Sequence, residues 1–230
     1  MKVLRHPLTV TALLAFNGGF VDTAGFLGLH GLFVAHVTGN FVTLGAALVN
    51  GSYGILNKIL ALPEFIGVVA LARLVGHGLR TTDLSAARIL FAVKVGLLLA
   101  FFVLAVSYSP FADGDSPSAL LTGFVGIAAM ATQNAVQRVH MAAMPPSTVM
   151  TGTTVQATMD AVDLLTDWHS DQRSQTMVRF RRLGLSLVSF AVGCACAALL
   201  YAFVGFWCLA LTVVVGTIAA AIQPKESKDT

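Results

Sequence analysis

The chain has 230 residues, of which 56% are hydrophobic and only 11% are charged, and its formal net charge at pH 7 is +3. A water-soluble domain of this length does not carry so apolar a surface, so the composition excludes a soluble globular protein and indicates lipid as the solvent. The basic residues lie in short loops between apolar stretches, which favours orientation in a bilayer over binding to nucleic acid.

Long apolar runs follow one another along the chain, as in a bundle of transmembrane helices. The first run follows a basic N-terminus without a cleavage-site pattern, so we expect an uncleaved span and not a signal peptide. In chain order the runs cover residues 8–29, 33–49, 59–79, 89–107, 118–144, 148–165, 183–203 and 206–222.

The second and sixth runs differ from the others because each contains Thr-Gly followed by a polar residue. "HVTGNFVTLG" lies at residues 36–45 and "VMTGTTVQAT" at residues 149–158. A full span with such a sequence would turn polar groups toward lipid, which is costly. We therefore expect these two segments to enter and return on the same side, or to form short broken helices.

The distribution of Lys and Arg distinguishes two topologies. Eight crossings would place Arg73, Arg88 and Arg138 on or near the outside, against the positive-inside tendency. Six crossings leave only Lys58 outside. This topology predicts an inner-membrane protein with both termini in the cytoplasm, Ser52 outside and Ser85 inside.

Six crossings also divide the chain into two halves of three spans each. We expect a single membrane domain over residues 1–230, with a first half at 1–109, a second half at 118–223 and a polar tail at 224–230. Since each half has an odd number of spans, the second half must be inverted, as in many transporters. Aligning "GGFVDTAGF" with "QNAVQRVHM" pairs Asp22 with Gln137.

Two stretches, "GGFVDTAGFLGLHGLFVAHVTGN" and "QNAVQRVHMAAMPPSTVMTGT", resemble the YoaK-like family of small bacterial membrane proteins, whose domain has no known function. The resemblance covers nearly the whole chain and implies a multi-pass inner-membrane protein with about six spans. It supplies no substrate. The chain departs from the usual form at Val37, where a Met often precedes Thr-Gly-Asn, and either residue fills apolar space.

Polar residues inside the apolar runs are the candidates for binding a solute or an ion. Asp22 lies deep in the first run, where its carboxyl could bind a cation or carry a proton, or could instead cap a broken helix or pair with Lys94. We expect Lys94 to reach the cytoplasmic interface and Glu64 to mark a helix start after Pro63. The candidate residues are Asp22, Thr38, Gly39, Asn40, Gln133, Asn134, Gln137, Thr151, Gly152 and Thr153.

The chain contains none of the common enzyme motifs, such as a phosphate-binding glycine loop with Lys, a nucleophile elbow or His-Glu-x-x-His. We expect no catalytic residues, no metal site and no cofactor. Two function classes remain: a small secondary transporter or channel, and an accessory or structural membrane protein that acts through helix–helix contacts. The expected partners are the lipid bilayer and a small solute or ion, and a homodimer stays open.

Overall fold

The computed structural model describes residues 7–51, 54–79, 85–166 and 172–222, and these residues form helices and loops but no strand. The all-α prediction is therefore confirmed for the described residues. Ser52 and the tail at 224–230 lie outside them. The elements are α1 (Pro7–Gly28), α2 (Gly39–Asn50), α3 (Ile55–Gly78), α4 (Ala86–Tyr108), α5 (Pro117–His140), α6 (Met150–Thr166), α7 (Arg173–Val204), the 3-10 helix η2 (Gly205–Cys208) and α8 (Leu209–Ile222).

Not every helix is long and apolar enough to cross a membrane. The helices α2 and α6 have 12 and 17 residues, and at about 1.5 Å per residue both are shorter than a hydrocarbon core of about 30 Å. Within the described residues, the stretches that are long and apolar enough are Leu8–Gly28, Ile55–Gly78, Ala86–Tyr108, Pro117–His140 and Arg173–Ile222. The last of them has 50 residues and contains α7, η2 and α8.

The positions where helices begin agree better with capping residues than with the edges of the apolar runs. The Ser85 and Ser116 side chains accept backbone N–H bonds at the starts of α4 and α5. The second apolar run becomes helical only at Gly39. The expectation that Glu64 marks a helix start is wrong, because α3 begins at Ile55 and Pro63 lies inside it.

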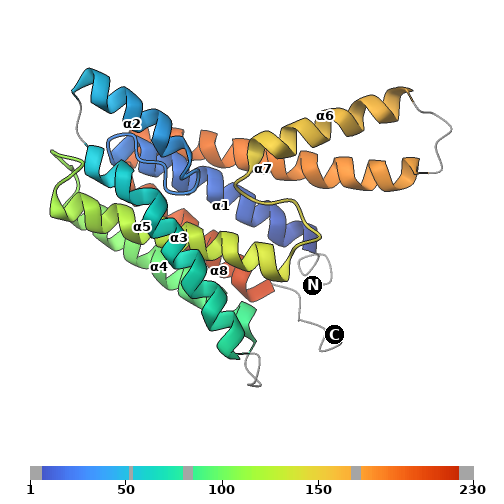
Figure 1. The fold of residues 1–230 in the computed structure, drawn as a ribbon, viewed down its shortest axis with the longest axis horizontal. Helices are drawn as coiled ribbons and strands as arrows, with labels where there is room; N and C mark the ends of the chain where they lie inside the picture. Colours follow the sequence, from blue (N-terminus) through green and yellow to red (C-terminus); the bar gives the residue numbers. More distant parts are fainter. Residues whose placement is uncertain (1–6, 52–53, 80–84, 167–171, 223–230) are drawn as a thin grey trace.

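The long helices run between two ends of one bundle (Figure 1). The helix α1 packs against α7 and α8, α5 packs against α3 and α4, and α4 also contacts α8. The short helices lie at the periphery, with α2 on α3 and α6 on α7. The helix α6 and the first part of α7 project from the bundle as a two-helix arm.

The loop at residues 109–116 closes one end of the bundle, which we call the acidic-loop end. Its Asp115 Oδ1 accepts a 3.0 Å hydrogen bond from the Asn57 amide at the start of α3. His30 Nε2, just after α1, lies 2.9 Å from the Phe111 carbonyl oxygen. Phe111 also packs edge-on against Phe206 of η2, with ring centroids 5.9 Å apart. The ends of α1 and α7 and the starts of α3 and α8 therefore meet at this end.

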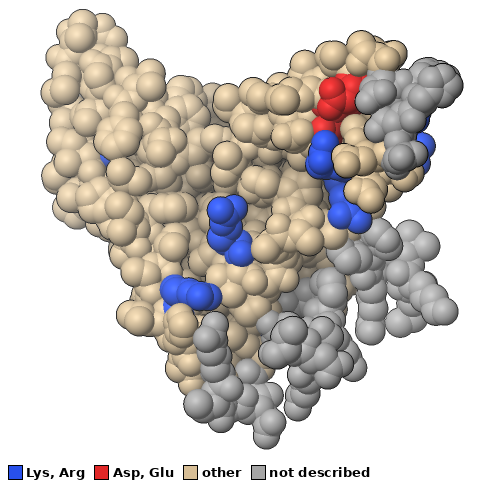
Figure 2. All heavy atoms as spheres, turned by 45° about the vertical axis from the view of Figure 1, so that its right-hand side comes forward, with Lys and Arg blue, Asp and Glu red and all other residues tan. Residues whose placement is uncertain are grey.

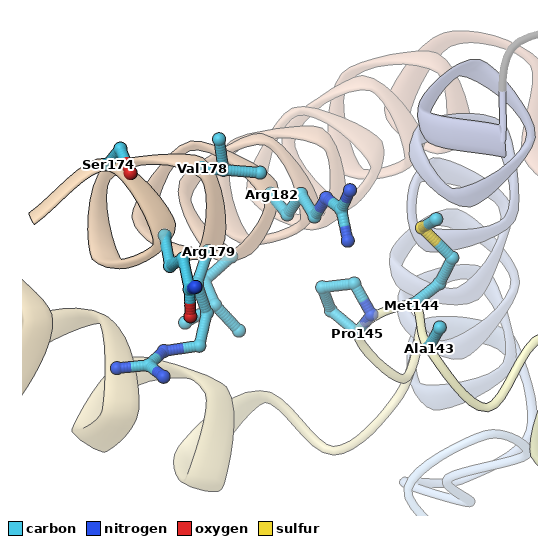
Figure 3. A pocket seen from close by; sticks show the side chains of 9 residues that line it. Ala143, Met144, Pro145, Ser174, Val178, Arg179 and Arg182 are labelled. Carbon is cyan, nitrogen blue, oxygen red and sulfur yellow. The ribbon is translucent and has the colours of Figure 1, made fainter. Parts of the chain in front are cut away.

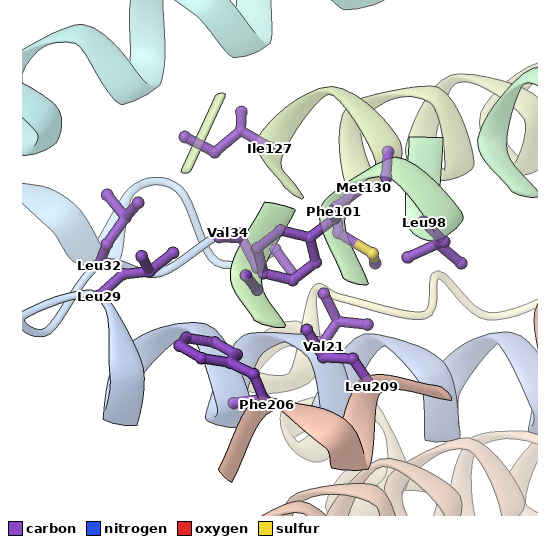
Figure 4. Packing of buried hydrophobic residues seen from close by; sticks show 14 of the residues in the cluster. Val21, Leu29, Leu32, Val34, Leu98, Phe101, Ile127, Met130, Phe206 and Leu209 are labelled. Carbon is purple, nitrogen blue, oxygen red and sulfur yellow. The ribbon is translucent and has the colours of Figure 1, made fainter. Parts of the chain in front are cut away.

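Apolar side chains from α1, α4, α5 and η2 form the main core (Figure 4). Phe206 lies at its base, where Gly205 has a positive φ of 56° that favours glycine. Val21, Phe101 and Met130 converge on the same core and are all buried. The turn at Gly205 thus places the start of α8 against α1 and α4.

Glycine allows α1 and α7 to approach closely. A Cβ atom on Gly193 of α7 would lie 2.2 Å from the Phe16 carbonyl oxygen, and one on Gly19 of α1 would lie 2.3 Å from that of Phe190. Real Cβ atoms do not approach so closely, so no larger residue fits without moving a helix backbone. Such small-residue contacts are typical of helix pairs in membranes.

The expectation that Lys94 reaches the interface is wrong. Its side chain is fully buried, and Nζ has no hydrogen-bond partner among the described residues. Lys94 lies beside α8, where a Cβ on Gly216 would be 3.5 Å from Nζ, so the missing side chain of Gly216 leaves room for it. It does not pair with Asp22, whose carboxylate binds elsewhere.

Charged side chains occupy little of the described surface. On the face that Figure 2 shows, basic groups lie at several separate places, including the centre and the right, acidic groups lie at the right, and most of the remaining described surface carries no charge. The arginines of the described residues lie toward the end of the bundle opposite the acidic loop, which we call the basic end: Arg73, Arg88, Arg138, Arg173, Arg179, Arg181 and Arg182. A surface of this kind fits an apolar solvent around the middle of the bundle.

Candidate functional site

Two loops turn back into the bundle instead of continuing away from it. Residues 29–38 follow α1 and lead to α2, and residues 141–149 follow α5 and lead to α6. Both run toward the middle of the molecule (Figure 1). We call them the first and second returning loops. Backbone amides in such a place have no water and need partners from the protein.

Asp22 on α1 supplies partners to the first returning loop. Its Oδ1 accepts hydrogen bonds from the amides of Ala35 at 2.7 Å and His36 at 3.2 Å. Its Oδ2 lies 2.7 Å from Nδ1 of the His36 ring. Only 4% of Asp22 is exposed. Of the roles left open for Asp22, the structure therefore places it as an anchor of the loop that precedes α2.

Asn40 closes the same loop from the other side. Its Oδ1 accepts from the Phe33 amide at 2.8 Å, and its Nδ2 donates to the Phe33 carbonyl oxygen at 2.7 Å. Gly39 lies directly under the Phe33 ring, since a Cβ there would be 2.9 Å from the nearest ring atom. Thr38 is the N-cap of α2, but its side chain makes no capping bond. The polar closure of the loop thus comes from Asn40 and not from Thr38.

Carboxamides on α5 anchor the second returning loop. Gln137 Oε1 accepts from the Ser147 amide at 3.2 Å and also from the Ser147 hydroxyl. Gln133 Nε2 donates to Ser147 Oγ at 2.8 Å and to the Leu14 carbonyl oxygen at 3.0 Å. The Thr148 hydroxyl donates to Asn134 Oδ1 at 2.6 Å. These three carboxamide residues, all of them predicted candidates, therefore hold the loop that precedes α6, and together with Arg138 we call them the polar band of α5.

A cavity of about 750 Å³ lies where the two returning loops meet. Thr38 from the first motif and Thr151 from the second both line it, together with Asn134 and Gln137. The opposite wall is apolar and comes from the middle of α3, with Leu62, Phe65 and Val69. The structure therefore brings both Thr-Gly segments and part of the α5 polar band to one cavity.

The remaining candidates do not line this cavity. Asp22, Asn40 and Gln133 lie behind it as anchors of the loops. Gly152 lies in the first turn of α6, where a Cβ would meet no atom closer than 3.9 Å. Thr153 is buried, and its hydroxyl donates to the Val149 carbonyl oxygen at 2.9 Å. Neither glycine of the two motifs has a positive φ, so the breaks in the helices lie in the loops before the motifs.

Some cavity residues were not among the predicted candidates. His36 and Arg138 line the cavity, and so does Thr148 of the second returning loop. Arg138 directly follows the candidate Gln137, and His36 is the first residue of the segment at 36–45, so their positions gave a usable signal. Thr148 had no such signal, because its place depends on how the loop returns.

A second cavity of about 560 Å³ lies at the basic end, between the second returning loop and the start of α7 (Figure 3). Arg182 points toward Pro145, whereas Arg179 turns toward α6. There Arg179 binds both carboxylate oxygens of Asp160, with Nε–Oδ2 and Nη2–Oδ1 distances of 2.8 and 2.6 Å. Asp160 is fully buried, so this ion pair fastens α6 to α7.

Comparison with known proteins places the chain in a family. A family model described as "Protein of unknown function (DUF1275)" matches residues 10–222. The "UPF0700 transmembrane protein YoaK" of Bacillus subtilis (strain 168) is 29% identical over 202 residues, which cover 86% of this chain and 86% of the relative. No solved structure matches the chain. Because the family match extends over most of its length, the chain belongs to the DUF1275 family, as its resemblance to YoaK-like membrane proteins implied.

Proposed function

We propose that the protein is a small secondary transporter or channel of the inner membrane, in which the cavity between the two returning loops holds a small solute or ion. The observation that carries the proposal is the meeting of two interrupted helical segments, one from each half of the chain, at one cavity. Transporters commonly bind their substrates at interrupted helices near the middle of the bilayer.

The directions of the long helices support six crossings. The helices α1, α4 and α7 end at the acidic-loop end, and α3, α5 and α8 begin there. The short helices cover only part of this distance. The helix α2 runs from the cavity toward the acidic-loop end, and α6 runs from the cavity toward the basic end.

The packing of the helices supports an inverted repeat. Suppose that each helix of the first half is exchanged with its counterpart in the second half, so that α1 to α4 correspond to α5 to α8 in order. The contact of α1 with α7 then becomes the contact of α5 with α3. The same exchange turns the contact of α2 with α3 into that of α6 with α7, and the contact of α4 with α5 into that of α8 with α1. The contacts of α1 with α5 and of α4 with α8 map onto themselves. Such a scheme is expected when two related halves are inserted in opposite orientations.

The positive-inside tendency places the basic end in the cytoplasm and the acidic-loop end outside. A cysteine at the exposed position 112 should then react with a membrane-impermeant thiol reagent added to intact cells, whereas one at the exposed position 174 should not. The variants Ala112→Cys and Ser174→Cys are made after Cys194, Cys196 and Cys208 have been replaced. Labelling of Ser174→Cys but not Ala112→Cys would contradict this orientation.

An accessory role through helix–helix contacts is the other function class that the sequence allows. The chain contains a small-residue stretch, "VGCACAALL" at residues 192–200, of a kind that suits close packing between helices. In the structure Gly193 of this stretch packs against α1 of the same chain, so the stretch serves internal packing. This contact removes the specific reason for assigning it to a partner protein.

The transport role is tested by blocking the cavity. Purified protein is screened for compounds that raise its melting temperature, and uptake of each stabilising compound is then measured in proteoliposomes. Thr151→Phe places a large ring in the cavity wall and should abolish both stabilisation and uptake. Thr158→Phe is the matched control, because it lies on the same helix, is also exposed and does not line the cavity. If no compound stabilises the protein, or if both variants behave alike, the proposal fails.

A further inference from the structure

The described residues in the wall of the cavity between the returning loops include a basic side chain but no acidic one. Among the described residues, Arg138 is the one Lys or Arg that lines the cavity, and no Asp or Glu of this part of the chain lines it. Asp22 bonds to Ala35 and His36 of this wall but does not line the cavity itself, and its carboxylate oxygens are occupied by the first returning loop. A bound cation would therefore meet an arginine and no carboxylate in this wall.

Gln137 contributes a donor whose orientation is fixed. A backbone amide can only donate, so the bond from the Ser147 amide identifies the atom that receives it as Oε1. The other terminal atom of the Gln137 carboxamide is then the donor Nε2. It is buried and has no partner among the described residues. A buried donor without an acceptor is costly. Gln137 lines the cavity, so a small shift of its side chain would let an oxygen atom of a ligand accept from Nε2 and remove this cost.

The N-terminus of α6 adds further donors. Met150 and Thr151 form the first turn of α6 and line the cavity, and their amides have no acceptor within the described part of the chain. The first-turn amides of α2 differ, because those of Gly39 and Asn40 bond to carbonyl oxygens in the preceding turn. Free amides at a helix start carry partial positive charge and favour anions. Of the two short helices, α6 is therefore the one that presents free donors to the cavity.

We infer that the cavity binds a small organic anion, a carboxylate with a short apolar tail. The carboxylate lies between the first turn of α6, the Gln137 amide and the Arg138 guanidinium, and the tail packs against Leu62, Phe65 and Val69 of α3. This inference rests on the proposed function, since it assigns a substrate class to the same cavity. It assigns an anion to the site, whereas the sequence alone did not determine the charge of the bound solute or ion.

The probes for the test are hexanoate and hexanamide, which match in size and differ in charge. Hexanoate should raise the melting temperature of the purified protein in a saturable manner, and hexanamide should not. Inorganic phosphate and chloride serve as anions without an apolar tail, and they should stabilise the protein less than hexanoate does.

Two variants locate the effect. Gln137→Glu keeps the acceptor for Ser147 but replaces the free donor by a carboxylate oxygen, so it should weaken hexanoate binding by about tenfold or more. Arg138→Gln should also weaken it, whereas Arg181→Gln, which removes another exposed arginine, on α7 and away from this cavity, should leave it unchanged. Melting temperatures without ligand show whether each variant folds.

The outcomes separate this inference from the proposed function. If hexanoate, phosphate and chloride all fail to stabilise the protein, or if hexanamide binds as well as hexanoate, the anion inference is overturned. Uptake of a neutral or cationic compound that Thr151→Phe blocks would then still support a transporter. If hexanoate binds equally to Gln137→Glu, Arg138→Gln and the wild type, the site lies elsewhere and the inference is also overturned.

Discussion

Asp22 and Gln137 hold the two returning loops in the same way, through one side-chain oxygen that accepts a backbone amide. Asp22 Oδ1 accepts from Ala35 at 2.7 Å, and Gln137 Oε1 accepts from Ser147 at 3.2 Å. One anchor is a carboxylate and the other a carboxamide. The shared requirement is therefore an acceptor oxygen at this place on α1 and on α5, and not a charge.

Asp22→Asn should fold with only a small loss of stability, because the carboxamide keeps an acceptor for the amides of Ala35 and His36. Asp22→Ala should lower the melting temperature strongly, since each buried amide left without an acceptor costs about 1–3 kcal/mol. Both are measured by thermal unfolding in detergent. Equal losses for the two variants would show that the charge itself is needed and would restore an ionic role for Asp22.

Asn40→Ala should destabilise the protein much more than Thr153→Ala. Asn40 is 2% exposed and bonds both backbone groups of Phe33, so its removal leaves a buried donor and a buried acceptor unpaired. Within the described residues the Thr153 hydroxyl bonds only the carbonyl oxygen of Val149, the residue just before its own helix. Thermal unfolding of both variants distinguishes these effects. Similar melting temperatures would mean that the closure of the first returning loop adds little to stability.

Gly193→Ala should destabilise the protein by about 1–3 kcal/mol or prevent folding, because the added Cβ would overlap the Phe16 carbonyl group. Gly184→Ala is the control on the same helix, where a Cβ meets no atom within 4 Å. The control should be neutral or slightly stabilising, since alanine favours the helix. The yield of monodisperse protein and its melting temperature measure both. An unaffected Gly193→Ala would mean that α1 and α7 can separate freely.

Arg179→Gln should cost about 3 kcal/mol, because it leaves the fully buried Asp160 carboxylate with Gln156 as its remaining donor. Asp160→Asn should cost less, since the Arg179 side chain is 53% exposed and can be solvated. The double variant should cost less than the sum of the two single ones. Arg181→Gln, an exposed neighbour on α7, is the control. Additive losses would show that the pair does not couple α6 to α7.

The sequence predicted the helices better than the loops, for a physical reason. Apolar runs located every long helix because lipid requires apolar side chains on the outside of the bundle as well as in its core, and the Thr-Gly segments marked the starts of the two short helices, α2 and α6. The starts of α3 and α7 were predicted too late because the chain continues as helix through polar residues at both ends of the bundle. The partners of Asp22 and Gln137 depend on how each loop returns, and nothing in local periodicity reports that path. Lys94 was misplaced because depth along a helix does not reveal which neighbour it faces.

The length of α7 matters for how this protein can be imaged. Its 32 residues extend about 48 Å at about 1.5 Å per residue, well beyond a hydrocarbon core of about 30 Å. The first part of α7 projects from the bundle in the arm with α6, where the Asp160–Arg179 pair limits relative motion of the two helices. A 24.1 kDa chain surrounded by a detergent micelle offers few features for particle alignment in electron cryomicroscopy. An antibody fragment raised against the basic end of this arm, away from the cavity, would give the particle a fiducial for alignment and leave the cavity unobstructed.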